Sequence, residues 1–205
     1  MNYDTLADTS TLTKTSAALA AHNFTSEVVA SKEDALAKIK ELIPANASIT
    51  NGASRTLEQI GYLDYLKEGS HEWKDLQSEV IKEEDAGKRA ALRRAASVSD
   101  YYLGSAHAVT EEGELFFASN SGSQFPQLAF TATNLILVVG AHKIVPTLDE
   151  ARARLITRIL PLEDENMKQK YGYGTQHNKT LILHNENPAM GRRVHVIFVN
   201  EVLGF

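Results

Sequence analysis

The sequence predicts an α/β fold in which a mainly parallel sheet carries helices on both faces. Apolar runs of strand length alternate with helical segments along the whole chain, a pattern typical of parallel α/β sheets. Residues 135–139 are continuously apolar and rich in β-branched side chains, as expected of a central strand that is buried on both faces. A turn signal within residues 106–117 predicts an additional β-hairpin.

The expected helices have apolar residues at helical spacing, and they cover residues 5–22, 31–43, 78–97, 147–160 and 161–170. Another helix is expected to start at Thr56, with a helix continuation and a loop over residues 61–74. Several of them start with a hydroxyl side chain that is followed three residues later by an acid or an amide, the pattern of a capping box. These pairs are Ser31 with Asp34, Thr56 with Gln59, and Thr147 with Glu150. Within residues 78–97, the spacing of Asp85 and Arg89 predicts an ion pair. A further short helix is expected after Ser123, which can cap it.

The expected strands are short apolar segments at residues 24–30, 47–50, 100–105, 107–109, 114–117, 135–139, 180–183 and 194–199. The turn between residues 109 and 114 has Gly113 in its tight position, which favours a hairpin. In the last strand Val194, Val196 and Phe198 should face one way, because side chains alternate along a strand. Together these elements predict one domain over residues 1–205, with residues 1–23 as an N-terminal helical appendage.

The composition of the chain argues against several classes of function. The chain has 205 residues, with 21 basic and 26 acidic side chains and a net charge of −5, which disfavours nucleic-acid binding. It contains no cysteine, so it cannot form a disulfide or bind an iron–sulfur cluster through its own thiolates. No metal site is expected, since the histidines are scattered without ligand spacing. Neither a signal peptide nor a membrane span is apparent, which predicts a cytoplasmic protein without membrane contact.

Two polar loops follow expected strands, and ligands in open α/β sheets bind beyond the carboxyl ends of strands. The first loop joins strand 47–50 to a helix, and its chemistry fits either an anion site or a plain turn. The second loop follows the hairpin. The substrate- or anion-binding candidates from these loops and from the end of strand 135–139 are Asn51, Gly52, Ser54, Ser119, Asn120, Gly122, Ser123 and Lys143. His107 and His142 are the candidate catalytic acid–base residues.

Four segments together resemble the lactate-utilisation (LUD) domain family. They are SDYYLGSAHAVTEEGELFFASNSGS, NLILVVGAHKIVPTLDEARARL, NGASRTLEQIGYLDYL and VHVIFVNEVLGF. The likeness covers roughly residues 24–205. It implies a modified Rossmann-like sheet within the ribose-phosphate isomerase and CoA-transferase superfold. It also implies a role in oxidising lactate to pyruvate, alongside partner subunits that carry iron–sulfur clusters.

The chain departs from this family at two places. Family members often have an Asp-Gly-x-Gly-Asn-Arg-like loop where this chain has SNSGSQ at residues 119–124. Longer members have a cysteine-rich insert where this chain has YGYGTQHN at residues 171–178. The resemblance assigns no catalytic residue, so none is carried over.

Three functions remain open from the sequence. The first is an accessory or substrate-binding subunit in lactate oxidation. The second is a stand-alone isomerase or transferase acting on a phosphorylated or CoA-linked metabolite, although the only nearby candidate for a glutamate nucleophile, Glu111, lies at the expected turn. The third is a non-catalytic interaction or regulatory module. The expected partners are a small carboxylate or phosphorylated metabolite, iron–sulfur partner subunits, or a second copy in a homodimer, and no cofactor is expected in this chain itself.

Overall fold

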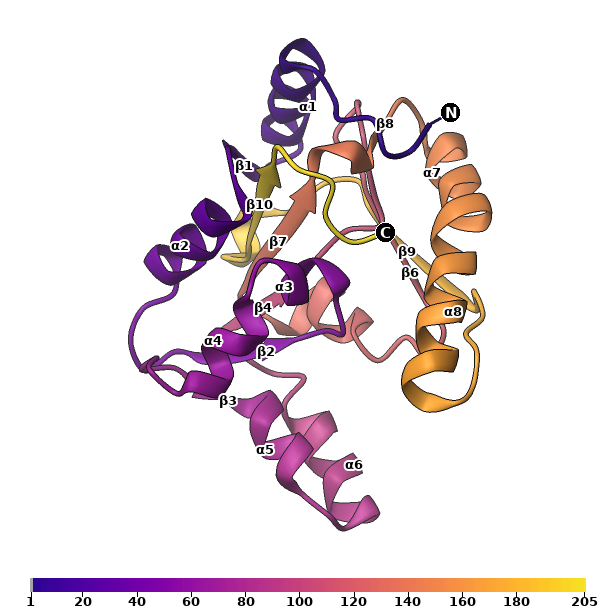
Figure 1. Ribbon diagram of the computed structural model, residues 1–205. Coiled ribbons are helices and arrows are strands. Elements are labelled where there is room, and N and C mark those ends of the chain that lie inside the picture. Colours follow the sequence, from indigo (N-terminus) through magenta and orange to yellow (C-terminus); the bar gives the residue numbers. More distant parts are fainter. Residues whose placement is uncertain (1) are drawn as a thin grey trace.

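The computed structural model describes residues 2–205 and has two sheets (Figure 1). Every pairing in the larger sheet is parallel, in the order β1-β10-β7-β4-β2-β3. Its strands are β1 (Thr25–Val29), β2 (Ser48–Asn51), β3 (Lys74–Asp75), β4 (Tyr101–Gly104), β7 (Asn134–Gly140) and β10 (Arg193–Val199). The smaller sheet is mixed, in the order β8-β5-β6-β9. It comprises β5 (Ala108–Thr110), β6 (Leu115–Ser119), β8 (Ile144–Val145) and β9 (Lys179–Leu183).

Eight α-helices connect and cover these strands within residues 2–205. They are α1 (Thr9–Ala21), α2 (Lys32–Leu42), α3 (Arg55–Gln59), α4 (Tyr62–Glu68), α5 (Leu76–Lys82), α6 (Ala86–Ala95), α7 (Leu148–Arg154) and α8 (Leu160–Tyr171). Two π-helical turns, η1 (Gln127–Thr131) and η3 (Leu155–Ile159), and two 3₁₀ turns, η2 (Ala141–Lys143) and η4 (Pro188–Met190), complete the described elements. The α/β class and the mainly parallel sheet are confirmed.

The two faces of the larger sheet are covered differently. Alternate side chains of β10 enter separate cores, with Val194, Val196 and Phe198 in one and Ile197 and Val199 in the other, as expected from strand geometry. The second core is closed by α2, α3 and α4. The first core is closed by α1 and by the smaller sheet, so only one face is covered wholly by helices. The outer face of the smaller sheet packs against α7 and η3.

The expected hairpin is present, and β8 and β9 extend it into the smaller sheet. Strands β5 and β6 pair antiparallel. Gly113 at their turn has φ +87°, in the left-handed region that glycine adopts without strain. Strand β9 pairs with β6, so it does not join the larger sheet beside β10. The smaller sheet is what brings the hairpin close to the edge described below.

Some of the helix ends and caps predicted from the sequence are wrong. Residues 78–97 do not form one helix, because Asp85 caps α6 by accepting a 2.8 Å hydrogen bond from the Lys88 amide, and it is not paired with Arg89. Ser123 does not cap the turn that follows it, since the N-cap of η1 is Pro126.

The helix after β8 is also different from the prediction. It runs on through η3 into α8 without a break at Pro161, which lies at the first positions of α8 directly after the π-helical turn. Proline has no N–H to donate inside a helix, and the hydrogen-bond register changes in the π-helical turn directly before it. The N-cap of α3 is Ser54, whose Oγ accepts from Leu57 N at 3.3 Å, and not Thr56. Thr56 is instead buried inside the candidate site.

Candidate functional site

Polar side chains gather where three neighbouring parallel strands end. Strands β7, β4 and β2 are adjacent in the sheet, and their carboxyl ends lead into residues 141–143, 105–107 and 52–56 respectively. Parallel strands end at the same edge, so these loops meet there. The sequence-predicted residues Asn51, His107, His142 and Lys143 all belong to this edge, together with Thr56 and Ser105.

Lys143 is the most deeply enclosed charged group at the edge. Its side chain is only 3% exposed. The ammonium Nζ donates to Thr56 Oγ1 at 3.0 Å and to Ser105 Oγ at 3.2 Å. No carboxylate of the described residues pairs with it. Burial, followed by the positive charge of Arg154, lowers the pKa of Lys143 to about 7, so a large fraction is the neutral amine near neutral pH.

Arg154 is a second buried cation, and it comes from the helix that covers the smaller sheet. It is fully buried, and Nη1 donates to the His107 carbonyl at 2.7 Å. Nε and Nη2 have no hydrogen-bond partner within the described part of the chain. Burial, followed by the charge of Arg158, lowers the pKa of Arg154 to about 10. Nε and Nη2 form the side-on edge of the guanidinium, which is suited to a bidentate carboxylate.

The other buried arginine, Arg192, has hydrogen-bond acceptors and a carboxylate from the protein itself. Arg192 donates to the carbonyls of Ala132, Gln127 and Leu128 and forms an ion pair with Glu186. Its charge and its donors are therefore matched by protein groups. Arg154 has one carbonyl partner and the Tyr3 ring 5.7 Å from its Cζ, but two of its nitrogen atoms have no hydrogen-bond partner among the described residues.

Both candidate histidines are neutral in this environment. His107 Nδ1 accepts from the Ala118 amide at 3.3 Å, which leaves the proton of the neutral ring on Nε2. Burial, followed by the charges of Lys143 and Arg154, lowers the pKa of His107 to about 3, and the same three causes in the same order lower the pKa of His142 to about 3. Both rings therefore present neutral imidazole, and acid–base chemistry at either would need a bound anion to raise its pKa.

Unpaired polar atoms concentrate at this edge. Six buried side-chain polar atoms have no partner among residues 2–205, and four of them belong to Asn51, His142 and Arg154. Buried polar groups in folded proteins are normally hydrogen-bonded. A cluster of exceptions around a buried lysine points to a ligand site.

The C-terminal residues cover the lysine. Gly204 has φ +73°, and a Cβ at this position would stand 2.7 Å from Lys143 Nζ. The Gly204 amide donates to Gln59 Oε1 at 2.5 Å, and Thr56 Oγ1 approaches the Leu203 carbonyl at 3.4 Å. Residues 201–205 contain no helix or strand. They form a cover over the amine without regular hydrogen bonding of their own.

The remaining predicted residues have protein partners. Ser54 caps α3, and Gly52 lies against the Tyr102 hydroxyl with no room for a side chain. In the second loop Ser119 Oγ donates to Gln124, and Asn120 accepts from Asn178 at 2.7 Å.

Gly122 adopts φ +79° and donates its amide to Ser119 Oγ at 2.9 Å, while Ser123 N donates to Ser121 Oγ at 3.3 Å. This loop is held to β9 by Lys179, which donates to the Ser121 carbonyl. Its role in ligand binding stays a prediction.

Sequence reasoning missed three participants: Arg154, Thr56 and Ser105. Arg154 lies one helical turn after Ala151 and beside Leu155, both buried. An arginine on the apolar stripe of a helix was a usable signal. The sequence pattern predicts a helix cap at Thr56 and the end of a strand at Ser105.

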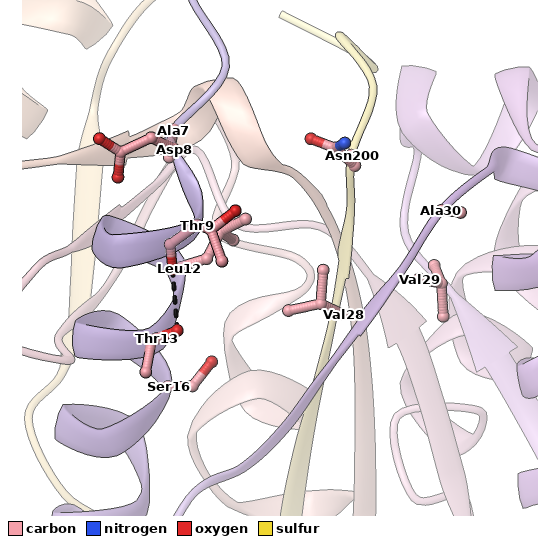
Figure 2. Close-up of a pocket in the computed structure, with 10 residues that line it drawn as sticks. All are labelled: Ala7, Asp8, Thr9, Leu12, Thr13, Ser16, Val28, Val29, Ala30 and Asn200. Carbon is pink, nitrogen blue, oxygen red and sulfur yellow. Dashed lines mark hydrogen bonds between the residues drawn. The ribbon is translucent and has the colours of Figure 1, made fainter.

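A groove is also present outside this set of residues (Figure 2). It runs between α1 and β1, has a volume of about 730 Å³ and is lined by Leu12, Thr13, Val28 and Asn200 among others. Asp8, its only ionisable lining residue, caps α1. The groove contains neither Lys143 nor Arg154.

Metal-binding clusters and membrane-spanning helices are both absent from residues 2–205. These residues contain no cluster of three or more histidine, cysteine or acidic side chains arranged to hold a metal ion. None of their helices has the length and apolar character required to cross a membrane.

The family profile of the LUD domain matches residues 12–199. This chain belongs to the LUD domain family. The family is linked to lactate utilisation. Among curated proteins, none matches this LUD domain significantly.

Two solved structures are similar to this protein to different degrees. A DUF162 family protein from Deinococcus radiodurans superposes with a TM-score of 0.55 at 15% identity, over 96% of this chain and 100% of that one. Ribose 5-phosphate isomerase A from Neisseria gonorrhoeae gives a TM-score of 0.37 at 16% identity, over 77% of this chain and 76% of that one. The first likeness supports a shared fold, and the second is too low to support any conclusion.

Proposed function

We propose that this LUD domain is the substrate-binding subunit of a lactate-oxidising system, and that it binds lactate or pyruvate at the Lys143 edge. The observation that carries the proposal is the pair of buried cations, Lys143 and Arg154, with no carboxylate partner from the described chain. Burying an unpaired charge is unfavourable by several kcal/mol. An anionic ligand would offset that cost.

The geometry favours a small carboxylate. The free Nε–Nη2 edge of Arg154 matches the two oxygens of one carboxylate. Lys143, Thr56 and Ser105 then supply one ammonium and two hydroxyl groups for an oxygen on the neighbouring carbon. A 2-hydroxy acid and its 2-oxo acid both have this arrangement of oxygens.

Oxidation also needs an electron acceptor. This chain has no thiolate to hold an iron–sulfur cluster, and the proposal assigns the redox centre to partner subunits. In this proposal the LUD domain positions the substrate, and a partner subunit accepts the electrons.

A thermal-shift panel on the purified chain tests the binding. Lactate and pyruvate should stabilise the protein, and lactamide should not, because it lacks the carboxylate. At about 100 times Kd the gain should reach about 2.7 kcal/mol. Arg154→Gln and Lys143→Met should remove the gain, while Lys82→Met, at an exposed lysine of α5, should keep it. Equal stabilisation by lactamide, or an undiminished gain in both site variants, would refute the proposal.

A further inference from the structure

The Lys143 amine has the surroundings of a nucleophile. It is buried, it contacts two hydroxyl groups, and no described carboxylate neutralises it. Lysines desolvated in this way, or placed beside another cation, react with carbonyl groups to form Schiff bases. Arg154 supplies such a second cation.

We infer that Lys143 forms a reversible imine with 2-oxo acids. The inference rests on the proposed binding of a carboxylate at this edge. The inference requires that an acid whose carboxylate binds the free edge of Arg154 brings its neighbouring carbonyl carbon within reach of Lys143 Nζ. Pyruvate is the smallest 2-oxo acid with a methyl group, and it is what oxidation of lactate yields.

The step balances without any further reactant. The neutral amine adds to the carbonyl carbon, a C–N bond forms, and the π electron pair moves to oxygen. Transfer of a proton from nitrogen to that oxygen gives a carbinolamine. Protonation and loss of the hydroxyl as water gives the iminium ion, and addition of water reverses the sequence. Thr56 and Ser105 hydroxyls, both within 3.2 Å of Nζ, are placed to relay these protons.

Neutral amine is available for this addition at neutral pH. The pKa of Lys143 is lowered to about 7, whereas an exposed lysine near neutral pH is almost wholly protonated. The rate of imine formation should therefore rise about tenfold per pH unit below about pH 7 and level off above it.

Access requires the C-terminal cover to move. Gly204 runs directly over Nζ, and the segment is held there by buried Leu203 and by the hydrogen bond that the Gly204 N–H donates to Gln59 Oε1. A segment with so few hydrogen bonds opens more readily than the strands beneath it.

Reductive trapping tests the inference. The full chain is incubated with pyruvate and cyanoborohydride, digested and mapped by mass spectrometry. The peptide containing Lys143 should gain the mass of one pyruvate less one oxygen atom. Acetone, which has a carbonyl but no carboxylate, should label this peptide at least about tenfold less, since it lacks the contact with Arg154. Lys143→Arg, which keeps the charge but not the nucleophile, should give no adduct at this position.

The outcomes separate the two proposals. Stabilisation by pyruvate without an adduct on Lys143 would overturn the imine and leave carboxylate binding intact. An adduct on Lys143 that acetone forms equally well would support a reactive lysine and contradict the carboxylate site. Labelling spread evenly over exposed lysines, or no labelling with no stabilisation, would overturn the imine as well.

Discussion

The cost of burying Lys143 should be visible as a pH dependence of stability. Replacing this residue by methionine keeps most of the side-chain volume and removes the ionisable group. In the folded protein the pKa of Lys143 is about 7, against 10.5 for the free side chain. The difference corresponds to about 4–5 kcal/mol, at about 1.4 kcal/mol per pH unit.

The sign follows from which state binds the proton. Below about pH 7 the lysine is charged in both states, and the folded protein bears the full cost of burying it. Between about pH 7 and about pH 10.5 only the unfolded state binds the proton, so the free energy of unfolding rises with pH. The stability advantage of Lys143→Met should therefore be largest near about pH 6 and shrink by about 3–5 kcal/mol towards about pH 10.

Urea unfolding of both proteins across this pH range measures the effect. Other titrating groups contribute equally to both proteins, so the difference between the two free energies isolates Lys143. Unpaired hydroxyls left at Thr56 and Ser105 add an offset that does not vary with pH. Lys82→Met should show no such trend. A flat difference between Lys143→Met and the parent protein would refute the claim that this lysine is buried and unpaired.

Three further predictions concern His142, Gly204 and the two buried arginines. The pKa of His142 is about 3, so stability should fall as pH drops from about 6.5 towards 3, and His142→Phe should weaken this fall in acid unfolding experiments. Gly204→Ala should destabilise the protein by about 1–3 kcal/mol more than Gly191→Ala, because both have positive φ but only Gly204 faces other atoms; equal losses in thermal melts would contradict the packing. Arg192→Met should cost about 3–5 kcal/mol by breaking a satisfied ion pair. In ligand-free melts Arg154→Met should cost much less, and a loss as large as that of Arg192→Met would argue for a structural role.

The position of the polar residues at the carboxyl edge of the sheet was predictable from the sequence. Strand β7 is the longest continuous apolar run, and such a strand must lie in the centre of a parallel sheet. Whatever follows it stands at the carboxyl edge, which placed His142 and Lys143 correctly. The same reasoning located Asn51 after β2.

The full set of contacts was not predictable. Arg154 lies more than 40 residues along the chain from His107, and only the packing of α7 against β5 brings them together. The smaller sheet, which creates that packing, depends on the pairing of β9 with β6 across a long connection. Local patterns do not encode such non-local pairings.

The position of Gly204 over Lys143 was also not predictable from the sequence. Gly204 looks like an ordinary glycine near the end of the printed chain, and only its left-handed φ and its closeness to Nζ reveal the constraint. The predicted start of α3 was wrong for a related reason. Ser54 and Thr56 are both good caps, and tertiary burial decided which of them became one.

The most direct test is a pH titration of the Lys143 amine itself by ¹⁵N-detected NMR, with and without lactate. Without lactate, the Nζ resonance should titrate near about pH 7, separate from the exposed lysines. With saturating lactate its pKa should rise, because a bound carboxylate favours the charged amine. The rise should be absent with lactamide and in Arg154→Gln. A Lys143 resonance that titrates with the exposed lysines and ignores lactate would contradict the account.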